Sequence, residues 1–469
     1  MIYFIFCIFI TELALGFNGK FFLINNISIR YYLFTILLFT LCVKSYSVIK
    51  QFLSKNCKQL AYNDRIKCLL NNYFSTFDKL LFLFLIINSL WIFIIPLLNN
   101  TQIKFSLKEC LCLSMFLLYF PIVILIKDKI FNWNICRKYI KLSILCLTII
   151  HIILYIGETI VEDASFTLNI FEKIVSITNG TRPTIMMPES YIRIIYPASI
   201  LLIMMFYFPL RDRDINDNDF KFVSETTLFI LLGICGIFTT VTKSLIYGII
   251  IGIAAYYILS IIHTINNRKS LNLKKTISIT FLVILSSIIF NYTLFDNFIF
   301  NRLKNSFVIS NENFMHEDST VHMSFNDPRR YKEELEGSKR ANRTRIIQME
   351  KIVGTWKQKP LLGIGYGGSC NNNYLRSSKN TPYSYEMAGL ALLMKIGIIG
   401  ISIWLVFFIY VLYTIIFKLA YKDSRIISVI YLLITLGVST QFNSFLFSSF
   451  GMFIILFCFL EMKYIELNN

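Results

Sequence analysis

The sequence has few charged residues and few histidines. Asp, Glu, Lys and Arg together make up 16% of the 469 residues, whereas hydrophobic residues make up 55% and the mean hydropathy is +0.61. One soluble core of this length cannot bury so much apolar surface, so a soluble protein is a poor interpretation. The one cluster that resembles a metal site, His316 and His322 with Glu317 and Asp318, matches no ligand spacing and is better interpreted as a polar loop. We expect no metal and no other cofactor.

The sequence also lacks a disulfide framework, a removable signal sequence and an internal repeat. All but one of the eleven cysteines fall in apolar runs, at their ends or in short basic loops, and only Cys370 lies in a long polar segment. We interpret them as small packing residues. The first residues contain neither a basic segment nor a small-residue cleavage site, which indicates a first span. The two halves show no matched pair of interrupted spans of the kind typical of many transporters, and this asymmetry favours an enzyme.

Apolar runs of about 20 residues recur along the chain, and a helix of this length crosses the ~30 Å hydrocarbon core of a bilayer. They predict an all-α polytopic integral membrane protein with about 12 transmembrane helices. The predicted spans are residues 2–17, 31–49, 80–98, 109–126, 141–157, 190–210, 226–240, 244–263, 276–295, 386–417, 426–441 and 444–461. We therefore expect nine helices within residues 1–295, with an outer loop at 158–189, then a large outer loop at 296–385 and three helices within 386–469.

Basic residues are concentrated in alternate connections between these spans. One set of short connections carries most of them, including Lys44, Lys50, Lys127, Lys129, Arg268, Lys274, Lys418 and Lys422. Because short cytoplasmic loops carry an excess of Lys and Arg, this set and both termini are predicted to be cytoplasmic and the long loop periplasmic. This orientation explains the net charge of +18 better than a nucleic-acid partner does. Loops as long as the two outer ones are usually functional, so we expect the chemistry there.

The end of the long loop combines a helical pattern with proline and glycine. Apolar residues from Ile346 to Trp356 recur at helical spacing and predict an amphipathic helix. Arg343 and Arg345 open this helix, either as a solvated basic face or as guanidinium groups that bind a phosphate. The glycine run that follows can bind phosphate through its N–H groups or form a tight turn, and it consists of Gly363, Gly365, Gly367 and Gly368.

Other charged residues stand near the predicted outer ends of spans. Glu386 begins the tenth span, where its carboxylate is either stabilised by the helix N-terminus or acts as a general base. Lys243 lies between two apolar runs, either reaching the interface with its ammonium group or serving a function. Arg182 and Arg193 precede and begin the sixth span. If the fold brings them together with Lys243 and Arg345, these cations would bind an anionic ligand at the outer leaflet.

The order of these features resembles that of the O-antigen polymerase (Wzy) and O-antigen ligase superfamily. In that superfamily an arginine precedes an amphipathic helix, a Pro-Leu-Leu-Gly-x-Gly turn and a Gly-hydrophobic-hydrophobic-Gly element, which here are Arg345, residues 360–365 and residues 397–400. Relatives also tend to carry an arginine before a proline in the third outer loop, as Arg182 does here, and a Ser-Arg pair where this chain has Thr242 and Lys243. Ligases usually have a histidine at the position of Glu386, whereas polymerases often have a glutamate.

The resemblance implies a GT-C-like, metal-independent and nucleotide-independent inverting glycosyltransferase. It implies that undecaprenyl-diphosphate-linked oligosaccharide repeat units are joined at the periplasmic face of the bacterial inner membrane, in lipopolysaccharide biosynthesis. Its partners would be the lipid-linked oligosaccharide, membrane lipid and a chain-length regulator. In this scheme Glu386 deprotonates the acceptor hydroxyl, and cations bind the diphosphate leaving group: Arg345 and Arg182, with Arg193, Lys243 and Arg343 beside them. Gly363 and Gly365 would form the turn.

Two alternatives remain. The first is an O-antigen ligase that transfers finished glycan to a lipid A core or another acceptor. The second, of another class, is a transporter or flippase of lipid-linked sugars, against which the single long outer loop and the scarcity of charges in the middle of the spans both argue.

Overall fold

The computed structural model describes residues 1–16, 23–24, 27–56, 61–161, 184–186, 193–195, 197–212, 220–267, 273–293, 299–300, 345–370, 385–420, 423–441 and 446–468. Within these residues the helices are α1 (Ile2–Leu15), α2 (Ile29–Asn56), α3 (Tyr62–Tyr73), α4 (Thr76–Ser89), η2 (Leu90–Ile94), α5 (Ile95–Leu98), α6 (Ile103–Cys110), η3 (Leu111–Leu118), α7 (Tyr119–Lys127), α8 (Trp133–Val161), η4 (Pro197–Ile203), α10 (Met204–Arg211), α11 (Phe220–Thr240), α12 (Lys243–Asn267), α13 (Leu273–Thr293), α16 (Ala388–Tyr413), η6 (Thr414–Leu419), η7 (Ser424–Ile426), α17 (Ile427–Ser439) and α18 (Ser449–Asn468). A further helix covers residues 345–358.

Two short antiparallel hairpins accompany the helices. Strand β1 (Leu23–Ile24) pairs with β2 (Ile27–Ser28), and β3 (Thr184–Met186) pairs with β4 (Arg193–Ile195). The second hairpin corrects the predicted start of the sixth span at residue 190. The helix begins only at Pro197, because proline lacks an N–H group and suits the first turn of a helix, while the preceding residues pair as a strand.

The prediction of an all-α polytopic membrane protein is confirmed. Six helical segments are long and apolar enough to cross a membrane, namely Ile29–Lys55, Thr76–Leu98, Ile103–Lys127, Trp133–Gly157, Lys243–Ile265 and Ala388–Leu419. Five shorter apolar helices are Ile2–Leu15, Ala198–Arg211, Glu225–Thr240, Phe281–Thr293 and Ser424–Ser439. Together with α18, these segments overlap every predicted span. The number that actually cross the membrane stays a prediction.

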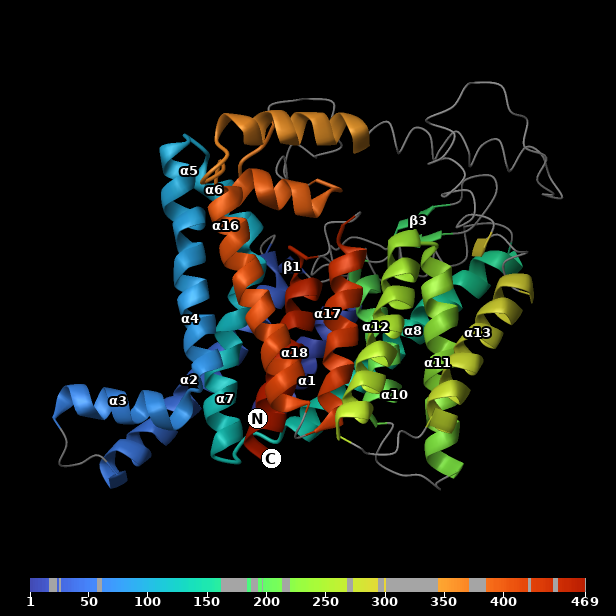
Figure 1. Cartoon of the computed structure of the whole chain (residues 1–469), viewed down its shortest axis with the longest axis horizontal. Helices are drawn as coiled ribbons and strands as arrows, with labels where there is room; N and C mark the ends of the chain where they lie inside the picture. Colours follow the sequence, from blue (N-terminus) through green and yellow to red (C-terminus); the bar gives the residue numbers. More distant parts are fainter. Residues whose placement is uncertain are drawn as a thin grey trace.

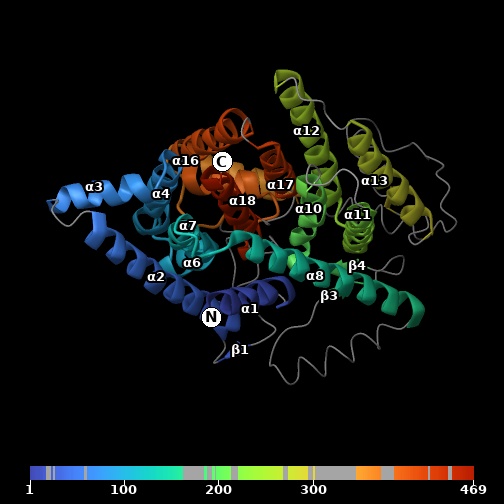
Figure 2. The ribbon, with the colours of Figure 1, turned by 90° about the horizontal axis from the view of Figure 1, so that it is seen from below.

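The helices form a bundle with two distinct ends (Figure 1). Both termini and the connection between α7 and α8 lie at one end, which we call the basic face. The connection between α5 and α6, the helix over residues 345–358 and the beginning of α16 lie at the other end, which we call the loop face. At the basic face, α2 and α3 project sideways from the bundle (Figure 2). Residues 62–73, interpreted from the sequence as part of a connection, are thus a helix.

Helix α18 occupies the middle of the bundle. Seen from below, it is surrounded by α16, α17, α10, α8, α1 and α7 (Figure 2). Its residues from Phe450 to Lys463 are all buried. Aromatic rings from several helices pack on it, as where Phe459 meets Phe77 with ring centroids 5.2 Å apart. A helix with this burial contacts protein on all sides.

Buried charges join α18 to its neighbours near the basic face. The carboxylate of Glu461 accepts hydrogen bonds from Trp133 Nε1 at 2.9 Å, from Arg137 Nε at 2.5 Å and from Arg211 Nε at 3.3 Å. Two residues later, Lys463 Nζ donates to Asp78 Oδ2 on α4 at 2.7 Å. Because buried charges are tolerated only when they are paired, these bonds fix α18 against several helices at once.

Candidate active site

A break in helix α16 shapes the loop face. Gly397 takes φ 64° and ψ −173°, a conformation that is nearly restricted to glycine, and it interrupts the hydrogen bonding of the helix. Residues 388–396 consequently lie across the loop face, whereas the rest of α16 runs down through the bundle (Figure 1). The tenth predicted span is therefore not one straight helix, which corrects the continuous span expected over residues 386–417.

The glycine turn at residues 360–367 fills the gap left by this break. Four backbone hydrogen bonds join the two segments: Ile364 N to Met394 O at 3.0 Å, Gly365 N to Lys395 O at 2.8 Å, Ile398 N to Pro360 O at 2.9 Å and Ile399 N to Leu361 O at 3.1 Å. The turn thus satisfies carbonyl and N–H groups that the broken helix leaves without partners. The Pro-Leu-Leu-Gly-x-Gly turn and the Gly-Ile-Ile-Gly element form one interlocked unit.

The glycines of this turn serve close backbone packing. Gly363, Gly365 and Gly367 all have positive φ angles, between 68° and 86°. A Cβ atom on Gly363 would overlap the carbonyl group of Lys395, and one on Gly365 would lie 2.7 Å from the ring of Pro96. The N–H groups of residues 363–368 all donate within the protein, including that of Gly367 to Glu109 Oε2 at 2.6 Å. These groups are not presented to a phosphate, which favours the tight-turn interpretation of the glycine run.

Arg345 and Glu386 meet at the loop face. Arg345 begins the helix over residues 345–358, Glu386 stands just before α16, and Arg345 Nε lies 3.1 Å from Glu386 Oε2. The backbone N–H of Glu386 also donates to Gln348 Oε1 at 3.3 Å, and Gln348 is itself buried. About a third of each charged side chain is exposed (35% and 30%). The pair is held by the fold and stays accessible to a ligand.

A second charged pair lies deeper, between α6 and α16. Lys395 Nζ forms an ion pair with Glu109 Oε1, and the two side chains are only 5% and 6% exposed. The ammonium group of Lys395 also lies 5.6 Å from the centroid of the Tyr385 ring. Tyr385 in turn accepts a hydrogen bond on its hydroxyl oxygen from Cys370 N at 2.7 Å. This network ties the segment that carries Glu386 to the glycine turn.

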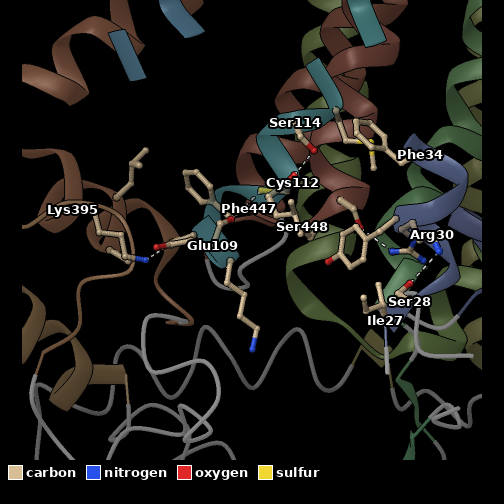
Figure 3. A pocket seen from close by; sticks show the side chains of 18 of the residues that line it. Ile27, Ser28, Arg30, Phe34, Glu109, Cys112, Ser114, Lys395, Phe447 and Ser448 are labelled. Carbon is tan, nitrogen blue, oxygen red and sulfur yellow. Dashed lines mark hydrogen bonds and ion pairs between the residues drawn. The ribbon is translucent and has the colours of Figure 1, made fainter. Parts of the chain in front are cut away.

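A cavity of ≈ 590 Å³ opens beside these residues. Its walls come from the start of α2, from α6 and η3, from residues 385–395 and from residues 447–449. Figure 3 shows Arg30 on one side and the Lys395–Glu109 pair on the other. Arg30 Nε lies 2.7 Å from Glu12 Oε2, and its Nη1 donates to Ser449 Oγ at 2.9 Å. Tyr385 forms part of the wall and directly precedes Glu386, so the cavity adjoins the Arg345–Glu386 pair.

Residues 228–405 match the family model described as Wzy_C, O-antigen ligase. The matched region contains Arg345, the glycine turn, Glu386, Lys395 and the break at Gly397. This match supports the assignment of the chain to the O-antigen polymerase/ligase superfamily. Members of this superfamily are membrane glycosyltransferase-like enzymes, and the match supports an O-antigen polymerase/ligase-type function. No curated protein and no solved structure gives a significant match.

The other residues that the sequence suggested for the site are only partly placed. Lys243 begins α12 at the loop face, next to a turn in which Val241 has a φ of 49°. Arg193 belongs to β4, opposite Met186. Arg182 and Arg343 lie outside the described residues, as do His316 and His322. The assembly of these cations around one ligand stays a prediction. Among the described residues, no group of three or more His, Cys, Asp or Glu side chains is arranged to hold a metal ion.

Sequence reasoning missed Glu109, Lys395 and Arg30. Each is an ionisable residue inside or at the edge of an apolar run, as in ALLMKIGIIG around Lys395. Such residues are costly in a membrane and are functional candidates by default. That rule would have identified them, but only the structure shows that they border one cavity in this O-antigen polymerase/ligase relative.

Proposed function

We propose that this protein is a polymerase that joins undecaprenyl-diphosphate-linked oligosaccharide repeat units at the periplasmic face of the bacterial inner membrane. The observation that carries the proposal is the contact of Arg345 with Glu386 inside the region that matches the family model. A cation and a carboxylate side by side are the two groups that glycosyl transfer from a diphosphate requires. One stabilises the leaving group and the other removes a proton from the acceptor.

In the proposed reaction, the acceptor hydroxyl oxygen attacks the anomeric carbon of the donor sugar while the bond from that carbon to the diphosphate oxygen breaks. Glu386 takes the proton of the hydroxyl, and the diphosphate leaves with the bonding electron pair. The guanidinium group of Arg345 binds diphosphate oxygens in place of the Glu386 carboxylate, with Arg182, Arg193, Arg343 and Lys243 as further cations. A single displacement of this kind inverts the configuration at the anomeric carbon.

The Arg345–Glu386 ion pair fits this sequence of events. A carboxylate bound to Arg345 through Nε is held in place until a diphosphate competes for the guanidinium group. Binding of the donor then releases Glu386 as a base beside the reacting carbon. The one-third exposure of both side chains supports such an exchange, because neither group has to be unburied first.

The residue at position 386 favours the polymerase over the ligase. The resemblance to the superfamily places a histidine there in ligases and a glutamate in many polymerases. The two enzymes also differ in the product that accumulates when they fail. Loss of a ligase leaves long chains on the lipid carrier, whereas loss of a polymerase leaves single repeat units on the final acceptor.

The test compares the variants Arg345→Ala, Arg345→Lys and Glu386→Gln in cells that lack their own copy of the gene. The readouts are the length distribution of the surface polysaccharide and the amount of protein in the membrane. We expect single repeats in all three variants, with a rate loss of about 10²–10⁴-fold for Glu386→Gln, because a general base contributes this much. Loss in Arg345→Lys, which keeps the charge, would indicate bidentate phosphate binding.

The matched control is Glu350→Gln, which neutralises an exposed carboxylate on the same helix as Arg345. It should leave chain length unchanged. Normal long chains in both Arg345→Ala and Glu386→Gln, at normal protein levels, would refute the proposed site. Long chains retained on the lipid carrier would instead identify the protein as a ligase.

A further inference from the structure

Polymerisation poses a binding problem that the Arg345–Glu386 pair does not solve alone. When two carrier-linked glycans are joined, two diphosphate heads are held at the loop face at the same time, one on the donor and one on the acceptor. Arg345 accounts for the donor. The acceptor requires a second site with cations of its own, close enough for its sugar to reach Glu386.

The cavity beside Tyr385 has the size and the charges for such a head. Its volume of ≈ 590 Å³ lies within the range of roughly 300–1,000 Å³ that is typical of ligand sites. Two buried cations face it from opposite walls, Arg30 and Lys395, each only 4% exposed. Burying cations at this depth is expensive, and each is balanced by one carboxylate, Glu12 or Glu109.

Arg30 retains capacity to bind an anion. A guanidinium group has five N–H donors. Three of them donate to Glu12 Oε2, the Glu12 carbonyl oxygen and Ser449 Oγ. The other two have no hydrogen-bond partner in the part of the chain that the structure describes. The group is also fixed in place by the ring of Phe450, whose centroid lies 4.9 Å away. A preorganised guanidinium with unused donors is suited to phosphate oxygens.

The rim of the cavity indicates where its ligand comes from. Tyr31 on α2 and Leu111 on η3 line the cavity and are 45% and 41% exposed. Both belong to segments long and apolar enough to span a membrane, so we expect their exposed surfaces to face lipid. A head attached to a lipid tail can therefore enter between α2 and η3 while its tail stays in the bilayer.

We propose that this cavity, with Arg30 and Lys395 as its cations, binds the diphosphate head of the acceptor lipid, which enters from the bilayer between α2 and η3. The inference rests on the proposed polymerase function, because only that reaction uses two carrier-linked substrates. The acceptor sugar then extends from the cavity past Tyr385 to the carboxylate of Glu386.

The experiment counts bound diphosphate lipid per chain. The purified full-length protein, in phosphatidylcholine nanodiscs, is saturated with geranylgeranyl diphosphate and weighed by native mass spectrometry. We expect two molecules per chain in the wild type and one in Ser114→Trp, because Ser114 lines the cavity on η3 and a tryptophan there fills it. Ala388→Trp fills the cavity from α16 and should also give one, which covers the case in which one variant fails to fold. Arg345→Ala should lose the other molecule.

The matched control is Ser287→Trp on α13. Like Ser114, Ser287 is a half-buried helical serine whose hydroxyl donates to a carbonyl of its own helix, but it does not line the cavity. It should keep two molecules. One molecule in the wild type that persists in Ser114→Trp and Ala388→Trp but disappears in Arg345→Ala would overturn this inference and leave the proposed function intact. If Arg345→Ala loses glycan transfer but binds as many diphosphate lipid molecules as the wild type, the result counts against the proposed function instead.

Two further arms identify the ligand. Inorganic diphosphate that fills the cavity as well as the lipid does would mean a soluble ligand. Equal occupancy by phosphatidylglycerol would mean an ordinary membrane lipid. Either result would overturn the assignment to a carrier-linked acceptor.

Discussion

Replacing Gly397 by alanine should separate the two interlocked segments at the loop face. The conformation of Gly397, with φ 64° and ψ −173°, costs a residue with a Cβ atom about 1–3 kcal/mol. The added Cβ would also overlap the carbonyl oxygen of Leu361 and lie 2.6 Å from Gly363 N. To relieve this overlap the turn must move away, which weakens the backbone bonds to Pro360 and Leu361, each with a net value of ~1 kcal/mol. The free energy of unfolding should therefore fall by about 4 kcal/mol.

The measurement is the thermal unfolding midpoint of the purified protein in detergent, together with polysaccharide length in cells. We expect a Tm lower by about 5 °C and shortened chains, because the displaced turn no longer holds the segment that carries Lys395 and Glu386. The control is Gly437→Ala in α17, where a Cβ atom meets nothing within 4 Å. If Gly397→Ala unfolds at the same temperature as Gly437→Ala and makes chains of normal length, the argument that the break and the turn support each other is wrong.

Three further outcomes are expected. Trp91→Phe removes the hydrogen bond from Trp91 Nε1 to Leu362 O, 2.8 Å long, and should lower the stability by about 1 kcal/mol in thermal unfolding. Burial, aided by the hydrogen bond to Asp128 and its negative charge, raises the pKa of Tyr73 to about 12. The neutral phenol therefore stabilises the fold, and this contribution is complete below the ordinary tyrosine pKa of about 10. It is lost as the pH rises through about 12. The Tm advantage of the wild type over Tyr73→Phe should therefore shrink between these two pH values. Glu461→Gln leaves Arg137 and Arg211 without their buried carboxylate and should cost about 3–5 kcal/mol, seen as loss of folded protein by size-exclusion chromatography.

Hydropathy alone predicted where the apolar helices lie, because a span must be apolar over its whole length whatever it packs against. It failed where local geometry decides. The run from Ala388 to Tyr413 is almost uniformly apolar, so nothing in its hydropathy indicates the break at Gly397. The hairpin of β3 and β4 was missed because Arg193–Ile195 and the helix after it form one apolar stretch.

The candidate site was predictable to the extent that it is local or carried by a motif. Arg345 and Glu386 are 41 residues apart, and the order of motifs suggested that they act together before the structure placed them in contact. Glu109 and Lys395 are 286 residues apart, and no spacing rule relates positions so distant. Arg30 was missed because its partners Glu12 and Ser449 come from opposite ends of the chain, and no local pattern relates the three residues.

The central place of α18 has a consequence for how the bundle is assembled. Helices enter the membrane in the order of the sequence, so the segments that surround α18 are all made before it. Until α18 inserts, Arg137 and Arg211 lack the carboxylate of Glu461, and Asp78 lacks the ammonium group of Lys463. Arg30, which is paired with Glu12, lacks its hydrogen bond to Ser449. Before α18 inserts, we therefore expect the earlier helices to carry inward-facing charges that lack these partners, and Glu461 and Lys463 supply the partners together. Final packing of the bundle should therefore occur late and in one step.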